Sequence, residues 1–165
     1  MEALREAQDR SVFACGEQAL DGYFQRQVTQ DIRRNITHCF VAVEAESGCV
    51  AGYYTLAATG IALADLPSDV ARKLPRYPMI PAARVGRLAV DHEFHGRGLG
   101  AALLADAALR ALTAAPAAFA LVVDAKNESA VAFYRHHGFL PCSSQPRTLF
   151  LPLATAAQAL LPKRK

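Results

Sequence analysis

The sequence predicts a single mixed α/β domain over residues 1–165, and three observations support that prediction. A hairpin pattern lies early in the chain, and a strand–glycine loop–helix–strand–helix–strand series follows it. No Gly/Ser-rich linker and no internal repeat divides the chain. With 52% hydrophobic and 20% charged residues, the composition excludes disorder as the main state.

The first part of the chain predicts a helix and a hairpin. Apolar spacing indicates one helix over Cys15–Arg34, and a break near Thr29 is left open. His38–Glu44 is rich in β-branched and aromatic residues, so we expect a strand there. Ser47-Gly48 predicts the turn that leads into a second strand over Cys49–Ala58.

The middle of the chain is less regular. Ile61–Leu63 is compatible with a short third strand, and Asp69–Leu74 lies between two prolines as a short helix. Ala83–Val90 predicts a strand that leads into the glycine-rich segment.

The second half alternates helices and strands. Leucine and alanine at helical spacing predict a helix over Gly98–Leu112, and the wholly apolar Phe119–Val123 predicts a buried central strand. Asn127–His137 predicts a helix that ends before Gly138, which suits the position after a helix C-cap. Thr148–Leu153 predicts the final strand.

The glycine-rich segment is the most informative part of the sequence. Gly96, Gly98 and Gly100 lie where a strand leads directly into a helix. Glycines let the backbone approach an anion, and the first N–H groups of a helix point at it, so we expect a pyrophosphate site; a tight turn without a ligand is the alternative. Ala101 follows where a Walker A loop needs lysine, and the glycine spacing is wrong for a Rossmann fingerprint.

Two motifs resemble the GNAT family of N-acetyltransferases. His95–Gly100 is similar to its pyrophosphate loop, [Gln/Arg]-x-x-Gly-x-[Gly/Ala], except that His95 replaces the usual Gln or Arg. Asn127–Phe139 is similar to its N-x-x-A-x-x-x-Y-x-x-x-G-F helix, which lies beside the cofactor thiol. The resemblance implies the GNAT acyltransferase fold, a central mixed, mostly antiparallel twisted sheet flanked by helices, with acetyl-CoA as the acetyl donor.

Further segments resemble the acetyltransferase toxins of type II toxin–antitoxin systems. They are Cys15–Phe24, Gly52–Leu56 and Leu74–Asp91. This resemblance implies acetylation of the α-amino group of aminoacyl-tRNA, which blocks translation. It also implies a ribbon–helix–helix antitoxin, a homodimer, and contact with DNA only through the antitoxin.

The GNAT resemblance also assigns site residues. Tyr134 is expected to be the general acid that protonates the departing thiolate, and a half-buried core tyrosine is the alternative. Asn127 is expected to cap its helix and to contact the pantetheine arm. The backbone of the strand before the loop is expected to pair with the pantetheine and to offer an N–H to the acetyl carbonyl. The expected acetyl-CoA-binding residues are Leu88, Ala89, Val90, His95, Gly96, Arg97, Gly98, Leu99, Gly100, Ala101, Asn127 and Phe133.

A general base is missing from the expected place. Many acetyltransferases have a glutamate on the strand before the glycine loop, but no acidic residue lies between Asp69 and Asp91. An α-amine has a pKa of about 7.7–8.0, against about 10.4 for lysine, so it can attack without a strong base. The absence of this glutamate agrees with the α-amine of an aminoacyl group as the acetyl acceptor. It argues mildly against lysine side chains of proteins as acceptors.

The net charge of +3 is a weak indication of a polyanionic partner. Solvated surface charge is the alternative for the basic residues of the first half. With the toxin resemblance, the residues expected to hold tRNA phosphates are Arg33, Arg34, Arg72, Lys73, Arg76 and Arg87.

Other classes of site and function are less well supported. His92, Glu93 and His95 lack a second cluster at metal-site spacing, so no metal site is expected. We expect a cytoplasmic protein without a membrane segment, because no apolar run approaches ~20 residues and no leader pattern opens the chain. The functional alternatives are acetylation of a protein N-terminus or a small-molecule amine, and a non-catalytic acetyl-CoA-binding module.

Overall fold

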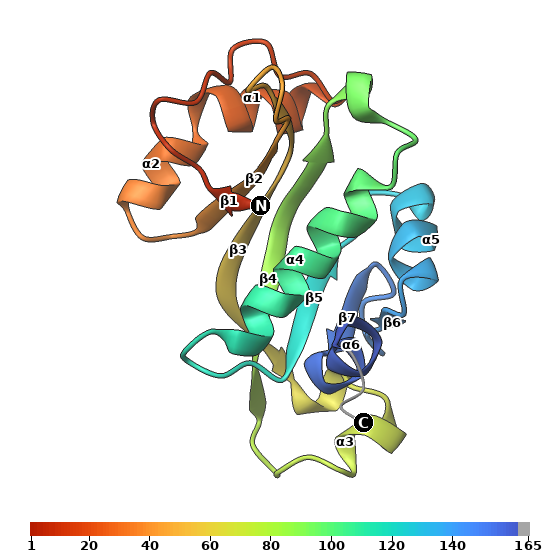
Figure 1. The fold of residues 1–165 in the computed structure, drawn as a ribbon. Coiled ribbons are helices and arrows are strands. Elements are labelled where there is room, and N and C mark those ends of the chain that lie inside the picture. The colour runs from red at the N-terminus through yellow and green to blue at the C-terminus, as the bar shows by residue number, and fades with distance from the viewer. Residues whose placement is uncertain (162–165) are drawn as a thin grey trace. The chain divides into compact units, whose positions relative to one another are not determined.

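The computed structural model describes residues 1–161, which form two compact units. Unit 1 contains Met1–Ala57 and Val85–Ala107, and unit 2 contains Ala58–Arg84 and the chain from Ala108 onward. Within residues 1–161, seven strands form hydrogen bonds in the order β1-β2-β3-β4-β5-β7-β6, with helices between them in sequence (Figure 1). The pairs β1–β2, β2–β3, β5–β7 and β6–β7 are antiparallel, which confirms the predicted α/β class with a mostly antiparallel sheet.

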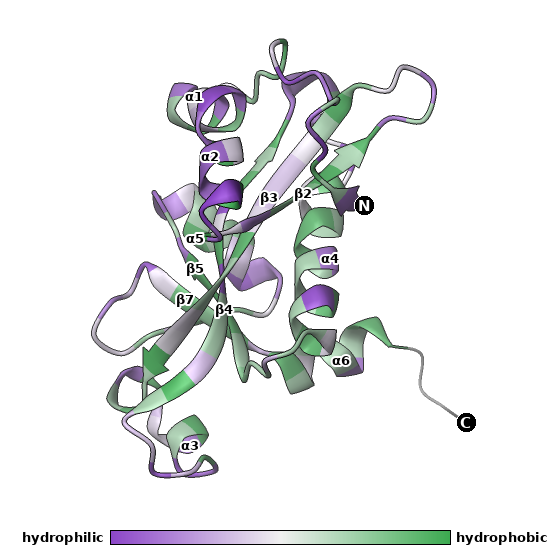
Figure 2. Ribbon diagram, turned by 90° about the vertical axis from the view of Figure 1, so that its left-hand side faces the viewer, coloured by the Kyte–Doolittle hydropathy of each residue, from purple (hydrophilic) through white to green (hydrophobic). Residues whose placement is uncertain are grey.

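Three elements belong to both units, because the division between the units falls within them. They are β3 (Val50–Ala62), β4 (Met79–Val90) and α4 (Leu99–Thr113). Figure 2 shows that α4 is largely hydrophobic along its length, whereas α1 and α2 are largely hydrophilic. The other elements of unit 1 are β1 (Glu2–Ala3), α1 (Gln18–Arg26), α2 (Val28–Arg33), β2 (His38–Val43) and the 3-10 helix η2 (His92–Phe94).

Unit 1 has an aromatic core under its two short helices. The rings of Phe24 and Tyr53 stack at 4.1 Å, and Phe13 packs edge-on against both. Val28 and Val41 complete this core with fully buried side chains. In the β2–β3 hairpin, Val41 pairs with Tyr53, so the hairpin carries core residues from both strands, as its sequence predicts.

The helix predicted over residues 15–34 is divided into α1 and α2 at Gln27. The Tyr23 hydroxyl donates to a carboxylate oxygen of Asp31 at 2.9 Å across the break. The break lies two residues before Thr29, near the position where the sequence left one open.

Unit 2 is built around strand β5, in which Ala120–Val123 are buried, as the sequence predicts, and Asp124 is exposed. Leu121 pairs with Leu151 and Val122 with Phe150 across the antiparallel β5–β7 ladder. The other elements of unit 2 are the 3-10 helix η1 (Leu63–Asp65), α3 (Ser68–Ala71), β5 (Ala120–Asp124), α5 (Glu128–His136), β6 (Leu140–Pro141), β7 (Thr148–Pro152) and α6 (Leu153–Leu160).

The separate strand expected at Ile61–Leu63 is wrong, because β3 runs unbroken to Ala62. Gly60 lies within the strand, where a Cβ would stand 2.8 Å from the Met79 methyl group. This glycine permits a close approach of β4 and is not a turn. The next strand also begins earlier than expected, at Met79, and the short strands β1 and β6 and helix α6 were not predicted.

Candidate active site

A buried carboxylate fixes the end of β4 in unit 1. Asp91 is 7% exposed, and its two carboxylate oxygens accept hydrogen bonds from the N–H groups of Ala14 and Glu93, each at 3.0 Å. Its own N–H donates to the Ala51 carbonyl at 2.8 Å. The strand exit is therefore tied to β3 and to the N-terminal segment. Sequence reasoning missed Asp91, and the available signal was an acidic residue at the end of an apolar strand.

His95 closes the glycine loop back onto β4. Its ring nitrogen Nε2 lies 2.7 Å from the Val90 carbonyl oxygen. A carbonyl only accepts, so Nε2 carries the proton. A glutamine amide can donate in the same way, which gives a physical reason why histidine can stand where the family pattern has Gln or Arg.

The backbone path of the loop requires glycine at two positions. Gly96 and Gly98 have φ values of +74° and +75°, a left-handed conformation that L side chains rarely adopt. A Cβ built on either residue meets no atom within 4 Å. The backbone therefore faces open space at both positions, as a phosphate-binding loop needs.

The helix that follows the loop begins where the sequence predicts. The Ala102 N–H donates to the Gly98 carbonyl at 3.1 Å, so the N–H groups of Leu99, Gly100 and Ala101 precede the first i→i−4 bond of α4. No acidic residue lies between Glu93 and Asp106 to oppose an anion, and the guanidinium of Arg97 lies 5.3 Å from the Phe94 ring centroid. The three N–H groups can donate hydrogen bonds to a pyrophosphate, and the positive charge of Arg97 is favourable for the same anion.

The strand before the loop contributes its backbone rather than its side chains. Ala89 is 5% exposed and belongs to the core of unit 1, as expected for a residue with no chemistry of its own. Leu88 and Val90 are half-buried.

Helix α5 of unit 2 carries the second predicted motif. Asn127 has extended backbone, and its side-chain oxygen accepts from the Ala130 N–H at 2.9 Å, which confirms its prediction as an N-cap. At the other end, Gly138 has a φ of +89°, and the Phe139 N–H donates to the Tyr134 carbonyl at 3.1 Å. Both ends of the helix that positions Tyr134 are thus fixed by local signals.

The Tyr134 ring is packed, but its hydroxyl has no hydrogen-bond partner within residues 1–161. The ring lies 5.2 Å from that of Phe133 and 5.4 Å from that of Phe139. Burial raises the pKa of Tyr134 to about 12. The phenol therefore keeps its proton at neutral pH and has it free to donate, as a general acid requires.

The three residues of unit 1 that the sequence predicts to hold tRNA phosphates differ in their surroundings. The guanidinium of Arg33 pairs with the exposed Glu6 carboxylate at 2.7 Å, and Arg34 is exposed. Arg87 is half-buried, with its guanidinium 3.5 Å from the centroid of the Tyr23 ring. Arg87 is therefore held in place, whereas Arg34 is free to meet a partner.

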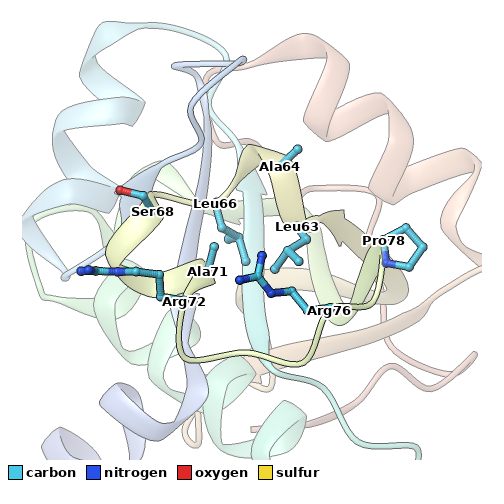
Figure 3. A pocket seen from close by; sticks show the side chains of 8 residues that line it. All are labelled: Leu63, Ala64, Leu66, Ser68, Ala71, Arg72, Arg76 and Pro78. Carbon is cyan, nitrogen blue, oxygen red and sulfur yellow. The ribbon is translucent and has the colours of Figure 1, made fainter.

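The three residues of unit 2 that the sequence predicts to hold tRNA phosphates, Arg72, Lys73 and Arg76, are all exposed. The structure brings Arg72 and Arg76 together, because both line one pocket of about 560 Å³ (Figure 3). Lys73 does not line it.

Two histidines near the loop, His92 and His95, form hydrogen bonds with backbone carbonyl oxygens. The ring nitrogen Nδ1 of His92 lies 2.8 Å from the Ala14 carbonyl, and this hydrogen bond raises the pKa of His92. In the part of the chain that the structure describes, no group of three His, Cys, Asp or Glu side chains could hold a metal ion. No helix in residues 1–161 is both long enough and apolar enough to cross a membrane.

Known proteins share both the sequence pattern and the fold. Residues 35–141 match the family described as "Acetyltransferase (GNAT) domain". The chain is 36% identical over 160 residues to a tRNA-acetylating toxin of Mycobacterium tuberculosis, covering 96% of this chain and 93% of that protein.

Two solved structures extend the comparison. The structure of AtaT complexed with acetyl-methionyl-tRNAfMet is similar with a TM-score of 0.87 and 32% identity, over 96% of each chain. A tyrosine-to-phenylalanine variant of AtaT, bound to the C-terminus of the antitoxin AtaR and acetyl-CoA, has a TM-score of 0.81 and 28% identity, over 98% of this chain and 97% of that one.

Proposed function

Because the chain belongs to the GNAT family of acetyltransferases, we propose that it transfers an acetyl group from acetyl-CoA to the α-amino group of aminoacyl-tRNA and thereby blocks translation. The observation that carries this proposal is the similarity to a tRNA-acetylating toxin over 96% of the chain. A match of that extent includes the segments on both sides of the GNAT motifs, where acceptor recognition is expected.

In this proposal unit 1 binds the acetyl donor. The N–H groups of Leu99, Gly100 and Ala101 hold the pyrophosphate, and Gly96 and Gly98 leave room for it. Arg97 and the His95-closed loop complete this surface. The backbone from Leu88 to Val90 pairs with the pantetheine arm and offers an N–H to the acetyl carbonyl. Acetyl-CoA supplies an activated thioester.

Unit 2 supplies the acid. The acceptor nitrogen forms a bond to the acetyl carbon, the carbon–sulfur bond breaks, and the Tyr134 hydroxyl gives its proton to the sulfur. The acceptor amine releases one proton to water. The Tyr134 phenolate then takes up a proton from water, which restores the phenol. Asn127 and Phe133 contact the pantetheine arm in this proposal, and Asn127 also caps the helix that holds Tyr134.

The basic residues serve the acceptor, and the assembly follows from the same family relation. Arg33, Arg34, Arg72, Lys73, Arg76 and Arg87 contact tRNA phosphates in this proposal. The antitoxin is of the ribbon–helix–helix type, the protein is a cytoplasmic homodimer, and DNA is contacted only through the antitoxin. Support for an antitoxin comes from AtaT, which is seen bound to the C-terminus of AtaR.

The test is incubation of the purified protein with labelled acetyl-CoA and bulk charged tRNA. We expect the label in aminoacyl-tRNA and, after mild alkaline release, in an N-acetyl amino acid whose identity names the acceptor. Deacylated tRNA is the control and should stay unlabelled. Labelling of peptide N-termini or small amines, with none in charged tRNA, would overturn the proposal in favour of a general N-acetyltransferase.

A further inference from the structure

The pocket beside Arg72 and Arg76 has a built shape. It lies in the segment between β3 and β4, whose two ends are joined by a 3.0 Å hydrogen bond from the Leu63 N–H to the Pro78 carbonyl. A second bond, from the Ser143 N–H to the Asp65 carbonyl at 2.8 Å, fixes this segment to the rest of unit 2. The pocket is therefore formed by the fold and does not depend on a ligand.

The floor of the pocket is aliphatic and its cations are unpaired. Leu63, Leu66 and Ala71 line it, and Leu66 belongs to the core of unit 2. In Figure 3, Arg76 directs its guanidinium to the middle of the lining residues, whereas Arg72 extends away from it. Within residues 1–161 neither guanidinium forms an ion pair or a side-chain hydrogen bond, in contrast to Arg33 and Arg84.

Acidic groups do not compete for these cations. No Asp or Glu lines the pocket. Of the two acids in the same segment, Asp65 accepts a hydrogen bond from Ser144, and Asp69 is exposed on α3. Tyr77, which follows Arg76 directly, is 62% exposed. Tyr77 does not line the pocket, but Arg76 does, and unstacked bases of single-stranded RNA stack on arginine planes as well as on aromatic rings.

We infer that this pocket is a subsite for one unpaired nucleotide at the 3′ end of the tRNA substrate. The base lies on Leu63, Leu66 and Ala71 beneath the Arg76 guanidinium, and Arg72 holds a flanking phosphate. Paired bases of an A-form stem are stacked and out of reach, so the nucleotide is an unpaired one. Of the unpaired nucleotides of tRNA, those at the 3′ end lie beside the amino acid that the proposed reaction acetylates. The inference rests on the proposed function, because it names where that substrate is held.

The test compares intact tRNA with tRNA that lacks its unpaired 3′ nucleotides, both deacylated and at one salt concentration. Fluorescence anisotropy measures the binding of each RNA to the wild type and to two variants. Arg76→Gln removes the cation over the pocket, and Lys73→Gln removes the same charge from a neighbouring exposed position outside it. Thermal unfolding of each variant verifies that the exposed substitution leaves the fold intact.

We expect Arg76→Gln to weaken binding of intact tRNA by roughly 5- to 160-fold, the range for loss of one stacked base, and to weaken binding of truncated tRNA much less. Lys73→Gln should weaken both RNAs by the same factor. Equal losses for both RNAs with Arg76→Gln, or no loss, would overturn the subsite. So would a variant that binds both RNAs normally but loses affinity for the antitoxin, because the pocket would then hold a peptide. If the wild type neither binds nor acetylates charged tRNA, the proposed function itself fails.

Discussion

The glycine loop of unit 1 and helix α5 of unit 2 use different atoms for their proposed chemistry. In the loop, backbone N–H groups around Gly98 and the start of α4 are the groups proposed to bind the anion, and the side chains only shape the path. On α5 the proposed chemistry rests on one hydroxyl, that of Tyr134, and the rest of the helix positions it. A backbone site should fail through conformation and steric exclusion, whereas a side-chain site should fail through removal of one group.

The largest expected effect comes from filling the backbone site. Gly98→Glu places a carboxylate in the proposed pyrophosphate site, so acetyl-CoA binding should be abolished in calorimetry. The matched control is Gly48→Glu in the β2–β3 turn, where φ is +73° and a Cβ also meets no atom within 4 Å. Both variants carry the same left-handed strain of about 1–2 kcal/mol. Equal loss of binding in both variants would point to general destabilisation and would remove the loop from the donor site.

The second effect tests the side-chain site. Tyr134→Phe keeps the ring and its packing, so the free energy of unfolding should change little. Loss of the proton donor should lower kcat by ~10²–10⁴-fold with acetyl-CoA affinity largely kept. Tyr23→Phe is the contrast, because its hydroxyl is bonded to Asp31: it should lower the free energy of unfolding by about 1 kcal/mol and leave kcat unchanged. If Tyr134→Phe had the kcat of the wild type, the Tyr134 hydroxyl would not be the general acid.

Local signals explain why the sequence predicted so much of both regions. Asn127 and Gly138 mark the ends of α5 by their own conformational preferences, and the apolar run of β5 marks a buried strand wherever it lies. Two-residue strands such as β1 and β6 carry no pattern, because each exists only through its partner strand.

Contacts between distant residues explain what could not be predicted. Asp91 fixes the strand exit only because Ala14 lies against it, and the residues are 77 positions apart. Arg33 and Arg72 look alike in the sequence, yet Arg33 meets Glu6, 27 positions away, and Arg72 lines a pocket. Gly60 lies in a strand where a Cβ would stand 2.8 Å from the Met79 methyl group, 19 positions away. In each case the sequence shows the residue type but not its neighbour.

The pH dependence of the rate sharpens the difference between acceptor and acid. The acceptor α-amine has a pKa of about 7.7–8.0, so below that range the rate should fall about tenfold per pH unit as the amine becomes protonated. Burial raises the pKa of Tyr134 to about 12, so the acid stays protonated and the rate should be flat from about pH 8.5 to pH 10. The ester bond between the amino acid and the tRNA is hydrolysed at alkaline pH. The measurement therefore uses an acceptor in which an amide bond replaces that ester. A decline between pH 8.5 and pH 10 would assign the proton to a group other than Tyr134.

The smallest effect concerns the one side chain that shapes the backbone site. His95 donates from Nε2 to the Val90 carbonyl at 2.7 Å, which joins the loop to the end of β4. One neutral hydrogen bond is worth about 0.5–1.5 kcal/mol, so His95→Ala should weaken acetyl-CoA binding by about 2- to 12-fold. His95→Gln should retain affinity within about 2-fold, because the amide N–H can donate the same bond. Titration calorimetry on the three proteins separates the cases. If glutamine binds as weakly as alanine, the imidazole ring itself contacts the ligand; if alanine binds like the wild type, the loop holds its shape through its glycines alone.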